Sequence, residues 1–193
     1  MRAGGDPWLE RWLPLIAERA GGAPILELGC GTGLDTATLV RAGHRVVALD
    51  LSLASLALAK LRAPRASFHR QDLRDPFPVG EASVHVVLAS LSLHYFPWTE
   101  TVALVARIRA ALRPGGLLLC RLNSTADTHF GASGHPVLEE NLYLVDGQPK
   151  RFFDRPSAER LFAHGWKILS IEAATIDRYD LPKSVWELAL ERS

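Results

Sequence analysis

Residues 25–33 combine an apolar run, one acidic side chain and a loop with glycine at every second position. The stretch reads Ile-Leu-Glu-Leu-Gly-Cys-Gly-Thr-Gly, so that Glu27 comes just before Gly29, Gly31 and Gly33. Glycine has no Cβ and adopts positive φ freely, which lets a bulky ligand lie directly against the backbone of such a loop. The residue types therefore predict a ligand site built from backbone groups and a carboxylate.

Two more carboxylates stand where apolar runs end. Asp50 follows the run at 46–49, and Asp72 follows a shorter run further along the chain. A glycine loop after one strand and a carboxylate at the tip of the next form a nucleoside-binding arrangement in α/β proteins. We therefore expect these side chains to meet at one edge of a parallel sheet and to bind a nucleoside.

The spacing of the glycines discriminates between nucleosides. A dinucleotide fingerprint has the form G-x-G-x-x-G, whereas here the spacing is G-x-G-x-G and Leu34 occupies the third glycine position of that fingerprint. Carboxylates around the loop would repel a diphosphate and suit a cationic ligand without phosphate. An NAD-dependent oxidoreductase is therefore the less favoured enzyme, and a simple strand-to-helix turn is the alternative without a ligand.

Alternating strand and helix patterns predict the elements that position this loop. Strands are expected at about 24–28, 45–49, 66–70, 84–90 and 117–122, with helices at about 33–42, 52–62 and 98–112. Ser52 is suited to cap the second of these helices, and Arg-Pro-Gly-Gly at 113–116 predicts a turn after the third. Helices between successive strands predict a parallel sheet with right-handed crossovers.

The chain is expected to form one domain with four consecutive parts. These are an N-terminal helix or lid at 1–22, a ligand-binding core at 23–124, an insert or lid at 125–153, and a C-terminal helix and strand pair at 154–193. Asp6 and Pro7 are suited to start the first helix, which should end by Ala20. The stretch 123–150 is too long for an ordinary connection.

Local signals also mark the elements of the C-terminal half. Asp146–Gly147 predicts a turn inside the insert. Asp154 is suited to cap a helix that extends to about His164. Two late apolar runs, at 166–175 and 183–190, predict a final pair of strands.

Composition limits the classes of function. The chain has 193 residues, of which 22% are charged, and a formal net charge of +1, so no strong field attracts nucleic acid or a membrane. No apolar run approaches the roughly 18–20 residues that span a bilayer, and the first residues do not resemble a secretory leader. The two cysteines, Cys30 and Cys120, lack metal-site spacing. We expect a cytoplasmic monomer or homodimer without a metal.

Several motifs in order resemble those of a known family, the class I S-adenosylmethionine-dependent methyltransferases. The motifs are residues 25–33, 47–50, 71–73, 84–90 and 112–117. The resemblance covers about 23–124, and the C-terminal segment is similar to small bacterial methyltransferases of the tellurite-resistance and small-molecule groups. It implies a three-layer, Rossmann-like α/β fold with a seven-stranded, mostly parallel sheet whose last strand is antiparallel. S-adenosyl-L-methionine is the implied cofactor and S-adenosyl-L-homocysteine its product.

The resemblance also implies contacts with the methionine part of the cofactor. Glu27 and the backbone at Gly29 and Gly31 should meet this part, including its ammonium group. Gly33 should let the following helix begin close to the cofactor. Ser90, at the end of the fourth strand, should lie beside the methionine.

Further positions correspond to contacts with the nucleoside part of the cofactor. Asp50 should accept hydrogen bonds from both ribose hydroxyls, and Leu51 should pack on the adenine face. Asp72 should accept from the exocyclic amine of adenine, while the backbone N–H of Leu73 donates to a ring nitrogen.

Candidate acceptor-side residues follow the fourth and fifth strands, where open α/β sheets bind substrates. His94, beside Tyr95, is the candidate catalytic base or acceptor ligand, and a histidine packed under the loop is the alternative. Asn123 ends the fifth strand. Asp127 and His129 are further candidates, with exposed loop positions as the alternative.

Other polar and aromatic residues receive structural interpretations or roles in the variable part. His85 is expected to be a core residue with satisfied hydrogen bonds. Arg151 is expected to be a solvated charge, although it could pair with an acceptor carboxylate. Trp8 and Trp12 should pack in the core or in a lid. Residues expected to shape the acceptor pocket are Tyr143 and Tyr179.

The sequence therefore predicts an enzyme that methylates a small molecule. Methyl transfer from a sulfonium is an in-line displacement, which requires alignment in a dry pocket and a base only when the acceptor must lose a proton. A non-catalytic, S-adenosylmethionine-binding regulatory module is the alternative from another class. Nucleic-acid methylation is disfavoured because the chain has neither an Asp/Asn-Pro-Pro-Tyr/Phe tetrad nor a Pro-Cys nucleophile.

Overall fold

The large sheet has seven strands. The computed structural model describes residues 7–177 and 179–193. Its sheet has the order β3-β2-β1-β4-β5-β10-β9. These strands are β1 (Ile25–Leu28), β2 (Val46–Asp50), β3 (Ser67–Arg70), β4 (Val84–Ser90), β5 (Leu112–Asn123), β9 (Trp166–Ile176) and β10 (Lys183–Arg192). The first five are parallel to one another, whereas β10 runs antiparallel to β5 and β9, as expected for the last strand.

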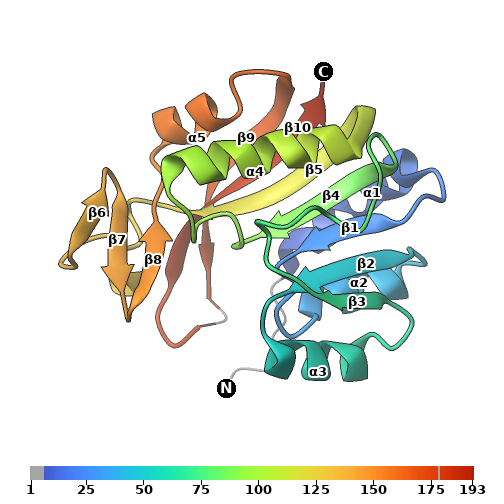
Figure 1. Ribbon diagram of the computed structural model, residues 1–193, viewed down its shortest axis with the longest axis horizontal. Coiled ribbons are helices and arrows are strands. Elements are labelled where there is room, and N and C mark those ends of the chain that lie inside the picture. Colours follow the sequence, from blue (N-terminus) through green and yellow to red (C-terminus); the bar gives the residue numbers. More distant parts are fainter. Residues whose placement is uncertain (1–6, 178) are drawn as a thin grey trace.

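Helices cover both faces of this sheet and give three layers (Figure 1). They are α1 (Leu13–Ala20), α2 (Leu34–Arg41), α3 (Leu53–Arg62), α4 (Trp98–Ala111) and α5 (Arg155–Leu161). Successive β5 side chains belong to different cores: Leu118 packs with α4 and α5, whereas Leu119 packs with α1 and α2. Because side chains alternate across a strand, the sheet separates two hydrophobic cores.

Local sequence signals account for most helix boundaries. The Ser52 hydroxyl accepts a hydrogen bond from the backbone N–H of Ser55 at 3.2 Å, which confirms the predicted cap of α3. Asp154 caps α5 through a capping box with Ser157. The predicted extension of α5 to about His164 is wrong, because the helix ends at Leu161.

The N-terminal segment is two helices rather than one α-helix. A 3₁₀ helix, Pro7–Trp12, precedes α1, and Pro14 lies in the first turn of α1. Proline has no N–H to donate back to the preceding turn, so the α-helical pattern does not extend through this point. The predicted role of Asp6 lies outside the described residues.

The Arg-Pro-Gly-Gly stretch lies inside β5 rather than before it. Pairing with β4 passes from Leu112 opposite Val84 to Leu117 opposite Val86, so extra residues form a bulge. Gly115 has φ +72°, a conformation that favours glycine. The predicted turn is therefore an irregularity within a longer strand, and α4 ends at Ala111.

The insert forms a small antiparallel sheet of its own. It comprises β6 (Val137–Glu139), β7 (Leu142–Val145) and β8 (Gln148–Arg151). Asp146 and Gly147 both have positive φ, which confirms the predicted turn between β7 and β8. An isolated bridge pairs Ser124 with Phe153, so the chain enters and leaves the insert at adjacent points.

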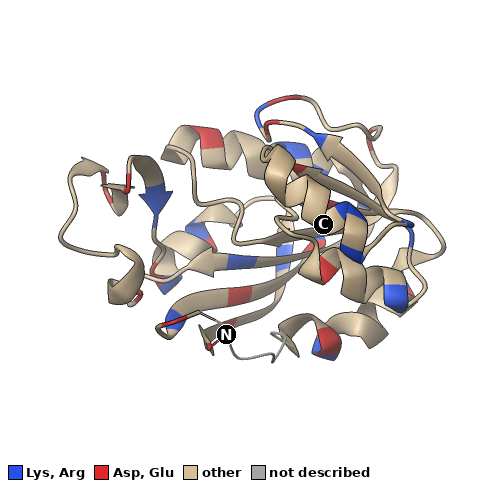
Figure 2. Cartoon of the chain, turned by 90° about the horizontal axis from the view of Figure 1, so that it is seen from below, with Lys and Arg blue, Asp and Glu red and all other residues tan. Residues whose placement is uncertain are grey.

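Charged residues are interspersed over the chain (Figure 2). Arg11 forms ion pairs with Glu172 and Glu187, and Arg19 forms one with Glu191. These contacts hold the N-terminal helices against the β9–β10 pair. Within the described ranges, no helix is long and apolar enough to cross a membrane.

Gly33 allows α2 and α3 to pack closely, and its replacement should lower stability. It has φ +79°, and a Cβ there would lie 2.7 Å from the Cβ of Ala59 in α3. We expect Gly33→Ala to lower the free energy of unfolding by about 2–4 kcal/mol through strain and overpacking.

Gly43→Ala is the matched control, because Gly43 has φ +91° and a Cβ there would meet no atom within 4 Å. Its cost should be about 1 kcal/mol, from backbone strain alone. Urea unfolding measures both variants, and equal losses would contradict the close contact between α2 and α3.

Candidate active site

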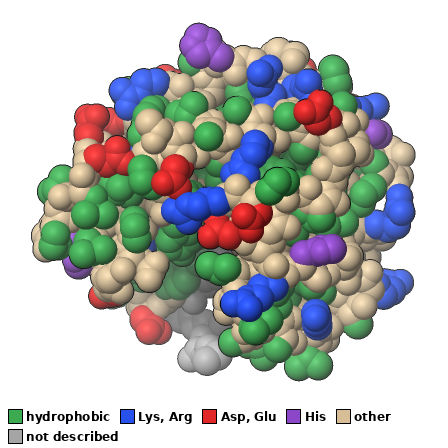
Figure 3. Space-filling view, in the orientation of Figure 1, with side chains coloured by type: hydrophobic (Ala, Val, Ile, Leu, Met, Phe, Trp, Pro, Cys, Tyr) green, Lys and Arg blue, Asp and Glu red, His purple; other side chains and the backbone are tan. Residues whose placement is uncertain are grey.

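One cavity of about 840 Å³ lies at the carboxyl ends of the parallel strands. Its wall includes the loop after β1, the tips of β2 and β4, the segment after β3, strand β8 and the β9–β10 connection. The space-filling view is hollowed between the small sheet and α3 (Figure 3). The main sheet and the insert therefore build one cavity together.

Acidic side chains gather at the end of the cavity formed by β1, β2 and β3. They are Glu27, Asp35, Asp50 and Asp72. The side chain of Glu27 is buried, and its Oε2 accepts a hydrogen bond from the Thr36 hydroxyl at 2.6 Å. Burial raises the pKa of Glu27 well above its ordinary value, and the charges of Asp35 and Asp50 raise it further. A bound cation would offset this repulsion.

The three loop glycines have different surroundings. Gly29 lines the cavity, and a Cβ there would lie 2.5 Å from the Cβ of Ser92. Gly31 also lines the cavity, but a Cβ there would meet no protein atom within 4 Å, so the loop leaves open space beside its backbone. Gly33 faces Ala59 and does not line the cavity. Gly33 therefore permits the helix packing behind the loop, whereas Gly29 and Gly31 form part of the wall.

The Asp50 carboxylate joins the glycine loop to the next turn. Its Oδ2 accepts from the backbone N–H of Gly31 at 2.7 Å, and its Oδ1 accepts from the backbone N–H of Ser52 at 2.8 Å. Each carboxylate oxygen has a further lone pair for a ligand donor. Leu51, which is 59% exposed, contributes an apolar wall beside Asp50.

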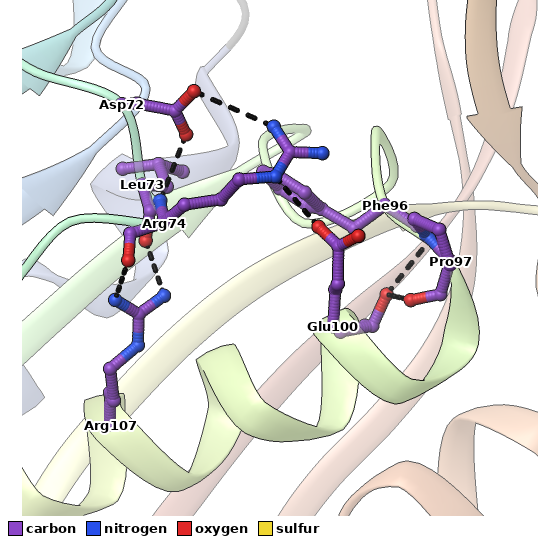
Figure 4. Close-up of polar contacts among 8 residues, drawn as sticks. Asp72, Leu73, Arg74, Phe96, Pro97, Glu100 and Arg107 are labelled. Carbon is purple, nitrogen blue, oxygen red and sulfur yellow. Dashed lines mark hydrogen bonds and ion pairs between the residues drawn. The ribbon is translucent and has the colours of Figure 1, made fainter.

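Asp72 is held by a network that attaches its loop to α4 (Figure 4). The backbone N–H of Arg74 donates to Asp72 Oδ1 at 2.9 Å, and Arg74 Nε donates to Glu100 at 2.7 Å. The Arg107 guanidinium donates to the carbonyls of Leu73 and Arg74. The sequence analysis missed Arg74 and Arg107, because a helical arginine gives no signal for a distant loop carbonyl.

The opposite end of the cavity carries basic and aromatic side chains. Lys150 comes from β8 and Lys183 from the start of β10, while the aromatic residues there are Phe130 and Tyr179. Tyr95 lies between the two ends, because its pKa, which burial raises, is raised further both by Tyr179 at this end and by Asp50 at the other. Lys183 Nζ lies 2.7 Å from Asp127 Oδ2, and both side chains are buried. The expectation of Asp127 as an exposed loop residue is therefore wrong. The two lysines were missed as well, since no local motif marks either position.

His94 lies in the wall between the two ends. Its side chain is 3% exposed, and its Nδ1 has no hydrogen-bond partner among the described residues. Burial lowers the pKa of His94 well below its ordinary value, and the charges of Lys183 and Lys150 lower it further. The imidazole is therefore neutral at pH 7 and has a nitrogen that can accept a proton.

Ser90 and Asn123 have different positions relative to the cavity. Ser90 lines the cavity, and its hydroxyl accepts from Arg121 Nε at 2.9 Å. Asn123 is buried behind the wall, where its Nδ2 donates to the carbonyl of Arg151 at 3.4 Å. Of these two strand-end residues, Ser90 alone reaches the ligand space.

Arg151 and His85 differ from their expected environments. Arg151 was expected to be solvated, but it is buried, forms an ion pair with Glu139 and donates to the carbonyl of Phe96. Its partners come from segments distant in sequence. His85 was expected to have satisfied hydrogen bonds, yet its buried Nδ1 has no partner among the described residues.

The remaining candidates lie outside the cavity. His129 is exposed, and Tyr143 packs against Phe152 with ring centroids 5.9 Å apart. Trp8 is buried, and its Nε1 donates to both carboxylate oxygens of Asp35, which confirms the interpretation of Trp8 as a packing residue. No cluster with the composition of a metal site occurs within residues 7–177 and 179–193.

A Rossmann-like sheet with an acidic cavity at its carboxyl ends defines a nucleoside-binding α/β protein. Residues 25–116 match the family described as "Methyltransferase domain". Residues 25–116 therefore form a methyltransferase domain, similar in sequence to those of S-adenosylmethionine-dependent methyltransferases.

Individual relatives agree with this assignment. The chain is 33% identical over 96 residues to an uncharacterized methyltransferase of Synechocystis and 34% identical over 102 residues to magnesium-protoporphyrin O-methyltransferase of Rhodobacter capsulatus. Each match covers 50% of this chain and 45% of the relative. A solved S-adenosylmethionine-dependent methyltransferase of Methanosarcina mazei has the same fold, with a TM-score of 0.79, 16% identity, and coverage of 93% of this chain and 97% of the other.

The burial of Glu27 among other carboxylates should make the ligand-free protein less stable as the pH rises. The raised pKa means that the folded state holds a proton that the unfolded state has lost, so the free energy of unfolding falls as the pH rises above the ordinary glutamate value. Glu27→Gln removes this titration. We expect equal stability below the ordinary glutamate pKa and a more stable variant at neutral pH.

Urea unfolding of the ligand-free protein over a pH series measures the effect. Glu81→Gln, on the exposed loop before β4, controls for the change of residue type. Parallel stability curves for wild type and Glu27→Gln would contradict the raised pKa of Glu27.

Proposed function

We propose that the protein transfers a methyl group from S-adenosylmethionine to a small-molecule acceptor. The observation that carries the proposal is one continuous cavity with an acidic end at the glycine loop and a basic, aromatic end at the insert. A cationic nucleoside and a second organic molecule match these two ends. Two relatives are named for methylation of small molecules. They are magnesium-protoporphyrin O-methyltransferase of Rhodobacter capsulatus and trans-aconitate 2-methyltransferase of Delftia acidovorans.

The acidic end has the groups needed to hold the cofactor. Glu27 and the loop at Gly29 and Gly31 would bind the methionine part, and the carboxylates favour its positive charges over a diphosphate. Ser90 would lie beside this part. The open space beside Gly31 fits a ligand that approaches the backbone.

The nucleoside part would extend along the tips of β2 and β3. Asp50 would accept from the ribose hydroxyls with its remaining lone pairs, and Leu51 would cover the adenine. Asp72 and the backbone N–H of Leu73 would read the adenine edge. Arg107 supports this role because it fixes the carbonyl of Leu73 against α4.

The chemistry on the acceptor side requires alignment and, for a protonated nucleophile, a base. When bound, S-adenosylmethionine supplies a methyl group already activated on a sulfonium. The walls contributed by β8 and by the segment after β4 would hold the acceptor and exclude water. His94, which lines the cavity, would take the proton of the acceptor on its imidazole ring, which is neutral at pH 7.

Calorimetric titration with S-adenosylmethionine, S-adenosylhomocysteine and NADH, in parallel, tests the proposal. We expect binding of the two sulfur nucleosides without binding of NADH. Binding of NADH alone would overturn the proposal. Binding of the sulfur nucleosides without product formation in a broad acceptor screen would favour the regulatory module.

Asp50→Ala should weaken S-adenosylmethionine binding at least about tenfold, because it removes charge-assisted hydrogen bonds and the anchor of Gly31. Asp75→Ala is the matched control, since Asp75 is exposed and lies outside the cavity wall. Titration calorimetry measures both. Unchanged affinity in Asp50→Ala, with the fold intact by circular dichroism, would remove Asp50 from the site.

His94→Asn should lower kcat about a hundredfold or more, with little change in S-adenosylmethionine affinity. Because its pKa is lowered, His94 stays in its base form below the ordinary histidine value of about 6.5. Wild-type kcat should therefore be level from neutral pH down to that value and fall only in more acidic solution. Release of S-adenosylhomocysteine measures kcat, and wild-type turnover in the variant would show that His94 is structural.

A further inference from the structure

We propose that the methyl acceptor is an organic acid, whose carboxylate binds Lys150 and whose planar part lies against Tyr95. The proposal rests on the proposed function of the cavity and adds the chemical class of the acceptor. Two features support it: the charge of Lys150, which pairs with no carboxylate among the described residues, and the aromatic wall of the cavity.

Lys183 and Asp127 form a pair whose acidic member is withdrawn from the cavity. Lys183 lines the cavity, whereas the Asp127 side chain is 0% exposed and lies behind it. Asp127 also accepts from the backbone N–H of Ser184 at 3.1 Å. The surface offered to a ligand is therefore positive, although the buried pair is electrically balanced.

Lys150 adds a charge that this pair does not neutralise. In the part of the chain that the structure describes, no carboxylate lies within ion-pair distance of Lys150, and its Nζ donates to the carbonyl of Phe130 at 2.9 Å. An ammonium has three donors, so this contact leaves others for a ligand.

The cost of holding Lys150 in this place points to an anion. Burial lowers the pKa of Lys150 and the charge of Lys183 lowers it further, while the charges of Asp127 and Asp146 raise it without cancelling these two effects. A carboxylate beside Lys150 would reverse both effects, because it pairs with the ammonium in a partly desolvated site. One unbalanced positive charge matches a monoanion. The acidic end of the same cavity disfavours a dianion such as a phosphate monoester.

Tyr95 provides a flat surface for the rest of the acceptor. It is 44% exposed where it lines the cavity, whereas the Phe130 ring packs against Tyr179, with centroids 5.5 Å apart, and against Lys183, whose Nζ lies 4.8 Å from its centroid. Aromatic faces favour offset stacking with planar groups. His94 lines the cavity beside Tyr95, with ring centroids 4.1 Å apart, so a planar acid held against Tyr95 would also lie near the imidazole of His94.

Matched acids and amides test this class of acceptor. The full chain is first saturated with S-adenosylhomocysteine. Benzoate, salicylate and 4-hydroxybenzoate, with the corresponding amides, are then titrated at up to millimolar concentrations by saturation-transfer NMR. We expect the acids to bind about tenfold or more tightly than the amides, since each acid adds a charge-assisted hydrogen bond. Equal binding, or no binding of any acid, would overturn the proposal.

Variants then identify the group that binds the carboxylate. Lys150→Met should reduce acid affinity about tenfold, to the level of the amides, and leave amide binding unchanged. Lys150→Arg should retain the preference for acids. Lys60→Met, at an exposed position on α3 outside the cavity wall, is the matched control and should behave as wild type. A preference for acids that persists in Lys150→Met would overturn the role of Lys150.

Binding of S-adenosylhomocysteine separates this proposal from the proposed function. If wild type does not bind S-adenosylhomocysteine, the proposed function fails. If wild type and Lys150→Met bind it equally but no preference for acids is found, the organic acid is wrong while the cofactor assignment stands. Equal binding of S-adenosylhomocysteine also shows that Lys150→Met is folded.

Discussion

The shape of the acidic end of the cavity depends on the hydrogen bonds that the Asp50 carboxylate accepts. One oxygen holds the backbone of Gly31, and the other holds the backbone of Ser52. These two hydrogen bonds therefore hold both the loop after β1 and the start of α3 against the tip of β2. Behind these hydrogen bonds, Gly33 lets α2 and α3 approach each other closely. Without these contacts the cavity would lose its shape even if every strand stayed in place.

The second property of the site is its separation of charge. Repelling carboxylates gather at one end, lysines gather at the other, and a neutral histidine lies between them. Neither arrangement favours the ligand-free protein, because buried like charges oppose each other. Such strain is typical of binding sites, where stability is given up for affinity. The ion pairs of Arg11 and Arg19, by contrast, involve residues that do not line the cavity, and they join the N-terminal helices to the sheet.

The sequence predicted the sheet and the acidic end well because both depend on local patterns. Strands follow apolar runs, the α3 cap follows from Ser52, and Asp50 stands out because it ends a strand. The environments of Asp127 and Arg151 could not be predicted in this way. Asp127 pairs with Lys183, 56 residues later, and Arg151 is enclosed by groups from other segments. Long-range pairs of this kind leave no periodic signal, so polar residues in a loop look solvated.

The bridge between Ser124 and Phe153 has a consequence for evolution. Because the chain enters and leaves the insert at adjacent points, the whole insert can be lengthened, shortened or exchanged without moving β5 or α5. The β7–β8 hairpin is fixed mainly by its own two-residue turn, so its side chains can diverge while the hairpin persists. Descendants of one ancestral chain could thus acquire a new acceptor specificity by changing the insert, while the hydrogen bonds of Asp50 are inherited unchanged.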